Sequence, residues 1–221
     1  MNHYGKRIIR LIFGLFIFAL GSFFTIQANI GLAPWEAFSM GVAYLTGMSY
    51  GNVVVLTGLV ILVIGIALKE KIGVGTILNT ILIGKFIDLI QYINIIPQLS
   101  NFWLGLLMAL SGQVTICLGS YLYIGAAMGC GPRDGLMVGL GKRFQRVPIG
   151  VIRGSIEGLV LVVGWLLGAK VGIGTAIYVF GIGFVLQITF KLLRFDVKNV
   201  VHESISDTAS NWFKKTNRRG V

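Results

Sequence analysis

Eight polar side chains lie inside or beside the long apolar stretches of this 221-residue sequence, where such groups are rare. Seven can carry a charge and one is an amide: Glu36, Lys85, Asp88, Arg133, Asp134, Arg153, Glu157 and Gln187. A charge near the centre of a bilayer costs at least about 2.5–3.5 kcal/mol on insertion scales, so unpaired charges are disfavoured there. We therefore expect these groups either to form buried ion pairs or to line the path of a substrate or ion.

Two pairs of these residues have helical spacing. Lys85 and Asp88 are separated by three positions, and Arg153 and Glu157 by four. Residues so spaced share one face of a helix, so the members of each pair can neutralise each other. A buried ion pair that only joins helices and a substrate path both fit this pattern, and the sequence leaves the two interpretations open.

Glu36 and Asp134 each follow a proline by two positions, Pro34 and Pro132. Proline suits the first turn of a helix, and a carboxylate there is stabilised by the helix dipole. Capping of two short helices is one explanation of these carboxylates. The other is that the two helices, related by pseudo-symmetry, point their N-termini into a shared cavity, as discontinuous helices do in transporters.

The sequence contains neither a P-loop nor the usual histidine motif of zinc proteases. Gly141-Lys142 is followed by Arg143 rather than by Ser or Thr, so it is not a P-loop. His-Glu-x-x-His is missing, and the two histidines, His3 and His202, lie in the terminal flanks. We expect no enzyme activity, no cofactor and no metal, and we assign no catalytic residue.

The composition is that of an integral membrane protein. Hydrophobic residues make up 55% of the chain and charged residues only 12%, and the mean hydropathy is +0.84, whereas about a quarter of the residues of a soluble domain are charged. Six apolar runs are each long enough to cross a hydrocarbon core of about 30 Å. They lie near 11–30, 52–68, 73–93, 103–127, 149–168 and 172–193.

The apolar part of the chain is an internal repeat. Leu20-Gly21-Ser22 returns as Leu118-Gly119-Ser120 about 98 residues later, and the motif of Lys71 to Thr76 returns at Lys170 to Thr175. Duplicated membrane units are typical of transporters and channels. The copies differ in charge, because Lys85 and Asp88 align with Phe184 and Gln187, and Arg153 and Glu157 align with Val54 and Gly58.

The net charge of +11 comes from flanks and loops, so it indicates membrane topology rather than nucleic-acid binding. With the basic N-terminus in the cytoplasm, Lys69 and Lys71 also fall inside only if the segment 34–47 does not cross. That segment has about 14 residues, which is short for a span and typical of a re-entrant or interfacial helix. In the alternative, 34–47 and 132–143 both cross and the chain has eight spans in parallel repeats.

Three spans in each copy is an odd number, so the second copy must insert upside down relative to the first. The expected fold is an all-α integral membrane protein of two inverted repeats, each with three transmembrane helices and one short re-entrant or interfacial helix. Its parts are a basic N-terminus (1–10), repeat 1 (11–97), repeat 2 (98–194) and a basic tail (195–221), with both termini in the cytoplasm.

Three segments resemble the YczE/YitT-type family of bacterial membrane proteins, and specifically its YczE branch. They are Gly31-Leu-Ala-Pro-Trp-Glu36, Gly131-Pro-Arg-Asp-Gly-Leu-Met137, and Gly164-Trp-Leu-Leu-Gly168 followed by Gly172-Ile-Gly-Thr175. The resemblance runs from about Arg7 to about Leu193. It implies a multi-pass protein of the bacterial plasma membrane and names no substrate.

The duplication and the intramembrane charges together predict a small secondary transporter or channel. The alternative is an accessory or regulatory membrane protein that transports nothing and acts on a partner through its basic cytoplasmic face. The expected partners are the lipid bilayer, a small-molecule or ion substrate, and a second copy or another membrane protein. Nucleic acid is not among them.

Overall fold

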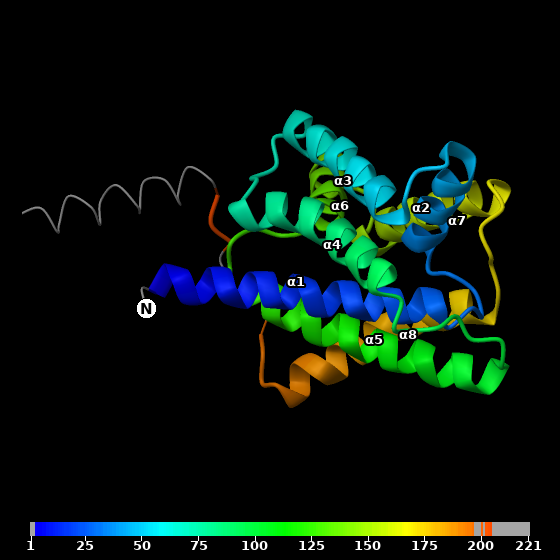
Figure 1. The fold of residues 1–221 in the computed structure, drawn as a ribbon. Coiled ribbons are helices and arrows are strands. Elements are labelled where there is room, and N and C mark those ends of the chain that lie inside the picture. Colours follow the sequence, from blue (N-terminus) through cyan, green and yellow to red (C-terminus); the bar gives the residue numbers. More distant parts are fainter. Residues whose placement is uncertain (1–2, 197–199, 201, 205–221) are drawn as a thin grey trace, which may run out of the picture.

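The computed structural model describes residues 3–196, 200 and 202–204, so most of the expected tail (195–221) lies outside the described residues. The described residues form eight α-helices (Figure 1). They are α1 (His3–Gln27), α2 (Pro34–Thr46), α3 (Tyr50–Ala67), α4 (Val74–Ile93), α5 (Phe102–Ile124), α6 (Pro132–Arg143), α7 (Ile149–Leu166) and α8 (Ile173–Leu192).

Six of the helices that the structure describes are long and apolar enough to cross a membrane: α1, α3, α4, α5, α7 and α8. The other two, α2 and α6, have 13 and 12 residues. At 1.5 Å per residue such helices reach only about 20 Å, which is less than the hydrocarbon thickness. The all-α class with six long apolar helices is therefore confirmed, and α2 and α6 are shorter than a usual span.

The boundaries of α2 follow directly from its sequence. Pro34 lies in the first turn, where a missing N–H costs no helical hydrogen bond. Gly47 ends the helix in the left-handed conformation with φ of 70°, and its N–H donates to the Ala43 carbonyl. The turn is short because Ser49 caps α3 by accepting a hydrogen bond from the Asn52 N–H.

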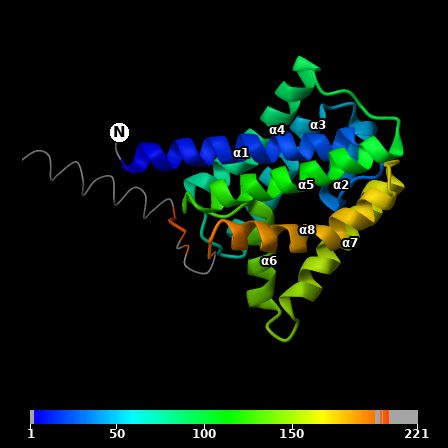
Figure 2. The same cartoon turned by 90° about the horizontal axis from the view of Figure 1, so that it is seen from below.

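Helices α1 and α5 form a long antiparallel pair (Figures 1 and 2). A methyl group built on Gly14 would lie 3.1 Å from the carbonyl oxygen of Gly119, and one built on Gly112 would lie 2.9 Å from that of Gly21. Close backbone approach through glycine is the usual packing of membrane helices, where lipid offers no hydrophobic gain. Leu11 of α1 is fully buried beside this seam.

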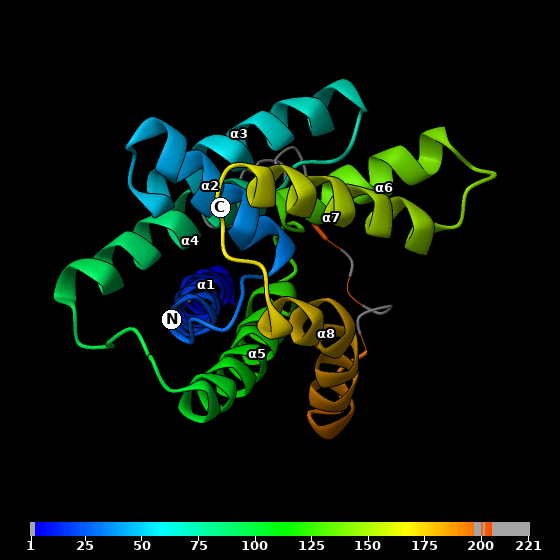
Figure 3. The same ribbon diagram turned by 90° about the vertical axis from the view of Figure 1, so that its right-hand side faces the viewer.

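The remaining helices interlock the two halves of the chain. Helix α4 packs on α1, and α8 packs on α5. Each short helix contacts a long helix of the other half, because α2 packs on α7 and α6 packs on α3 (Figure 3). Residues from both halves therefore meet in the middle of the molecule.

Two glycine turns hold the starts of the short helices in place. Gly31 precedes α2 with φ of 124°, and Gly129 precedes α6 with φ of 125°, a conformation that favours glycine. Next to these turns, the Ile30 carbonyl accepts from the N–H of Gly174 at 2.9 Å, and the Met128 carbonyl accepts from that of Gly75 at 2.7 Å. The entrances of α8 and α4 thereby anchor the turns that lead into α2 and α6.

Candidate functional site

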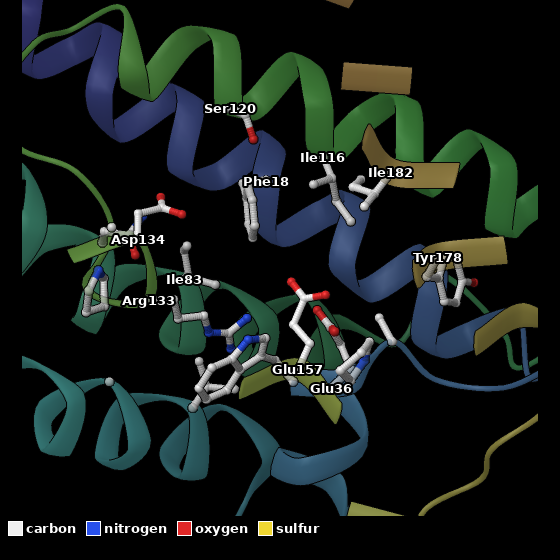
Figure 4. A pocket seen from close by; sticks show the side chains of 18 of the residues that line it. Phe18, Glu36, Ile83, Ile116, Ser120, Arg133, Asp134, Glu157, Tyr178 and Ile182 are labelled. Atoms are coloured by element: carbon white, nitrogen blue, oxygen red, sulfur yellow. The ribbon is translucent and has the colours of Figure 1, made fainter. Parts of the chain in front are cut away.

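A cavity of about 300 Å³ lies between the helices, and all eight contribute to its wall (Figure 4). This volume is at the lower end of the range for small-molecule sites in proteins. Five of the eight residues singled out from the sequence line it: Glu36, Arg133, Asp134, Arg153 and Glu157. The cavity thus gathers three carboxylates and two guanidinium groups in an otherwise largely apolar wall.

The N-terminal turns of the two short helices both face this cavity. Its lining includes Pro34-Trp35-Glu36 from α2 and Pro132-Arg133-Asp134 from α6. The first N–H groups of a helix have no intrahelical acceptor and carry partial positive charge, so these ends suit polar or anionic groups. Glu36 is buried, with 9% of its surface exposed. Both short helices therefore begin at the wall of one shared cavity.

Arg133 and Trp35 contact each other across the cavity wall. The guanidinium carbon lies 4.7 Å from the centre of the indole ring. An arginine over an aromatic face is attracted by the negative charge of the ring surface, most strongly where water is excluded. This contact fixes the direction of the Arg133 side chain and joins α6 to α2.

Arg153 and Glu157 form the ion pair expected from their spacing. Arg153 Nε donates to Glu157 Oε1 at 2.9 Å. The two side chains are 54% and 23% exposed, so the pair remains accessible and adds little to stability. Its location on the cavity wall is more informative than its strength, because an accessible pair can exchange partners with a bound molecule.

Asp134 lines the cavity and is exposed to it. The protein around its carboxyl displaces water, which raises the pKa of Asp134 above the ordinary value, while Arg153, Arg133 and the Tyr123 hydroxyl act in the opposite direction. Protonation of Asp134 would leave the two remaining carboxylates balanced by the two guanidinium groups. The charge of the cavity therefore depends on the protonation of this residue.

Lys85 and Asp88 lie outside the cavity, and the pair expected from their spacing does not form. Lys85 Nζ donates to Asn52 Oδ1 at 2.7 Å. The Asp88 carboxylate accepts from Ser49 Oγ and from the Gly51 N–H, both at 2.7 Å. Asp88 thus serves the first turn of α3, where the free N–H groups of the helix attract an anion.

Gln187 lies apart from the central cavity and lines a second one of about 190 Å³ between α7 and α8. The two cavities are neighbours, because Arg153 and Glu157 line both. Three of the eight positions singled out from the sequence thus lie outside the central cavity, namely Lys85, Asp88 and Gln187.

Sequence reasoning missed several polar or aromatic wall residues, namely Trp35, Tyr50, Asn79 and Tyr178. The repeat contained a signal for two of them, because Asn79 and Tyr178 occupy equivalent positions in the two copies. Trp35 and Arg133 are likewise equivalent. Aligning the copies and retaining polar residues at matched positions would have added these residues to the site.

The chain is similar to bacterial proteins over most of its length. Residues 5–191 match a family described as a family of unknown function (DUF6198). An uncharacterized protein of Haemophilus influenzae is 34% identical over 188 residues, which cover 85% of each chain. The uncharacterized membrane protein YczE of Bacillus subtilis is 30% identical over 176 residues, which cover 79% of this chain and 80% of YczE. No solved structure matches the chain.

These similarities confirm the resemblance to YczE that the glycine and proline motifs indicated. Together with the six candidate spans, they identify the chain as a multi-pass membrane protein of a bacterial family. The six candidate spans imply that the protein is embedded in a lipid bilayer. The cavity described above is therefore a polar site inside a membrane protein.

Proposed function

The chain belongs to the family of unknown function DUF6198, and we propose that it is a small secondary transporter whose substrate site is the central cavity. The observation that carries the proposal is the convergence of two short-helix N-termini, with their charged residues, on a cavity walled by all eight helices. Discontinuous or short helices that end at the middle of the membrane form the substrate sites of many transporters. A channel would need a continuous pore, whereas this site is a cavity.

We further propose that the two copies are inverted repeats. The contacts of the central seam support this, because Gly14 and Gly119 in one contact align with Gly112 and Gly21 in the other. An exchange of equivalent partners along antiparallel helices is what a two-fold axis in the membrane plane produces. The equivalent hydrogen bonds beside Gly31 and Gly129 support the same symmetry.

Both termini belong on the cytoplasmic side of the plasma membrane in this proposal. Arg7 Nη1 donates to Glu203 Oε1 at 2.7 Å, which joins the first helix to the chain after α8. Lys142 at the end of α6 pairs with Glu70 after α3 at 2.8 Å. These contacts, and the basic residues around them, agree with one positively charged inner face.

The proposed substrate is a small organic molecule that carries charged groups of both signs. A volume of about 300 Å³ exceeds what a bare ion needs. Glu36, with its buried side chain, can hold a cationic group, while Arg133 and Arg153 can hold an anionic one. Amino-acid-like zwitterions have this combination of charges.

The test is binding and counterflow with the purified full-length protein. Zwitterionic, anionic and cationic organic solutes are screened by the shift that each causes in the thermal unfolding midpoint, since a ligand that binds the folded state raises it. Solutes that bind are then tested for counterflow in proteoliposomes. Glu157→Gln should weaken both signals, while Lys85→Met, outside the cavity, should leave them unchanged. Equal signals from both variants would contradict the proposal that the central cavity is the substrate site.

A further inference from the structure

Helices α3 and α4 pack closely through glycine. A methyl group built on Gly51 would collide with the Gly84 carbonyl, and one built on Gly84 would collide with that of Gly51. One or two turns further on, a methyl group on Gly58 would lie 2.9 Å from Thr80 Cγ2. The first half of the chain thus closes its α3–α4 seam by direct backbone contact.

The second half contains the same glycine pair, but the pair is not in contact. Gly150 of α7 and Gly183 of α8 align with Gly51 and Gly84 of the first copy. A methyl group built on either would meet no atom within 4 Å among the described residues. Glycine is less favourable than alanine inside a helix, and in this conformation the pair gains no close packing to offset that cost.

The space between α7 and α8 is the second cavity. Figures 2 and 3 show the two helices diverging from their connection at residues 167–172. Gly183 lines this cavity together with Phe180 and Phe184, which are 74% and 70% exposed. The cavity shares Arg153 and Glu157 with the central one, so the gap leads directly to the proposed substrate site.

We propose that the gap between α7 and α8 is the entrance to the central cavity, and that it closes when Gly150 and Gly183 pack together as Gly51 and Gly84 do. The structure then represents a state with the α3–α4 seam closed and the α7–α8 seam open. A molecule that enters passes two phenyl rings and reaches the ion pair of Arg153 and Glu157. The assignment as an entrance rests on the proposed function, whereas the closing movement does not.

Closure can be tested with cysteine pairs in the full-length protein in native membranes. The background carries Cys117→Ala and Cys130→Ser, and the test variant adds Gly150→Cys and Gly183→Cys. A disulfide needs Cα atoms about 4.4–6.8 Å apart, so it reports closure of the seam. Oxidation with copper phenanthroline should form an intramolecular bridge, measured as lost labelling by a maleimide of high mass.

The matched control pair is Gly158→Cys with Gly183→Cys in the same background. Gly158 aligns with Leu59, which is 41% exposed and lies about 12 Å along the helix from Gly51, so closure leaves Gly158 and Gly183 apart. Bridging of the control at the same rate as the test pair would overturn the proposal, as would no bridge in the test pair. A bridge between two copies would also overturn it, because the gap would then be a dimer interface.

The outcomes separate this inference from the proposed function. If an intramolecular bridge forms but the protein shows no counterflow with any bound solute, the proposed closing movement is supported and the proposed transport function is contradicted. If counterflow occurs but no bridge forms, the proposed transport function is supported and the proposed closure of the entrance between α7 and α8 is contradicted. If both hold, the bridged protein should lose counterflow and regain it when the disulfide is reduced.

Discussion

The guanidinium group of Arg133 lies over the indole ring of Trp35, at 4.7 Å, and these two residues occupy the same position in the two copies of the repeat. Each is the second residue of its short helix, directly after a proline. In the inverted repeat that we propose, equivalent positions that touch lie near the two-fold axis. The two copies have diverged there into complementary partners, a cation and an aromatic ring.

The contact between Arg133 and Trp35 should contribute measurably to stability. Arg133→Lys retains the charge but loses the planar group that stacks on the ring, and Trp35→Leu removes the ring. We expect a coupling energy of about 0.5–2 kcal/mol between the two sites in a double-mutant cycle, measured by unfolding in mixed micelles. Arg146→Lys, in an exposed loop, is the control and should show no coupling to Trp35→Leu.

Gly21→Ala should destabilise the protein, although alanine is the better helix former. The added methyl group would lie 2.6 Å from the Ile116 amide nitrogen and 2.8 Å from the Gly112 carbonyl oxygen, so α1 and α5 must separate. We expect a loss of about 1–3 kcal/mol, the usual cost of overpacking. Gly154→Ala, where the methyl group meets open space, should be neutral or slightly stabilising, and equal losses would contradict the assigned seam.

Asp134 should make stability depend on pH. Because its pKa is raised in the folded protein, the folded state holds a proton that the unfolded chain has lost, and stability falls as pH rises from the ordinary value to the raised one. The nearby charges of Arg153, Arg133 and His202 limit the shift. Asp134→Asn should make the thermal unfolding midpoint less dependent on pH across this range. An unchanged pH dependence would show that Asp134 does not titrate there.

Sided labelling should distinguish inverted from parallel copies. Single cysteines introduced by Lys71→Cys and Lys170→Cys, in a background without Cys117 and Cys130, mark equivalent positions of the repeat. A maleimide that does not cross membranes should label position 170 in intact cells and position 71 only after lysis. Labelling of both positions from the same side would require parallel copies.

A large side chain at Gly183 should hold the proposed entrance open without harming the fold. Gly183→Leu extends into open space in this structure but would prevent the close approach of α7 and α8. We expect an unchanged thermal midpoint and at least a tenfold loss of counterflow, which corresponds to about 1.4 kcal/mol or more in the closing equilibrium. Gly158→Leu is the control, since its equivalent Leu59 has a large and exposed side chain while the α3–α4 seam is closed.

The sequence was sufficient to predict the helices and much of the site. Hydropathy predicts the six long helices, and Pro34, Gly47 and Pro132 mark the limits of the short ones. The ion pair of Arg153 and Glu157 follows from its spacing because both partners lie on one helix. Local patterns of this kind depend on a single element, so the rest of the fold does not alter them.

Features that depend on two helices were less predictable. Spacing places Lys85 and Asp88 on one face of α4, but it says nothing of the groups that α3 presents to that face. The free N–H of Gly51 and the Ser49 hydroxyl compete successfully for the Asp88 carboxylate. The matched glycines of the repeat do not by themselves decide packing either, because Gly51 and Gly84 are in contact whereas Gly150 and Gly183 remain apart.

The crossed packing of the short helices has a consequence for how the chain could have arisen. Because α2 rests on α7 and α6 rests on α3, a single copy would leave the partner of its short helix missing and would enclose no cavity. An unfused ancestor would need two molecules, and inverted copies would require the same polypeptide to insert in both orientations. A chain cut between α4 and α5 should accordingly regain its fold only when both pieces are made in the same cell.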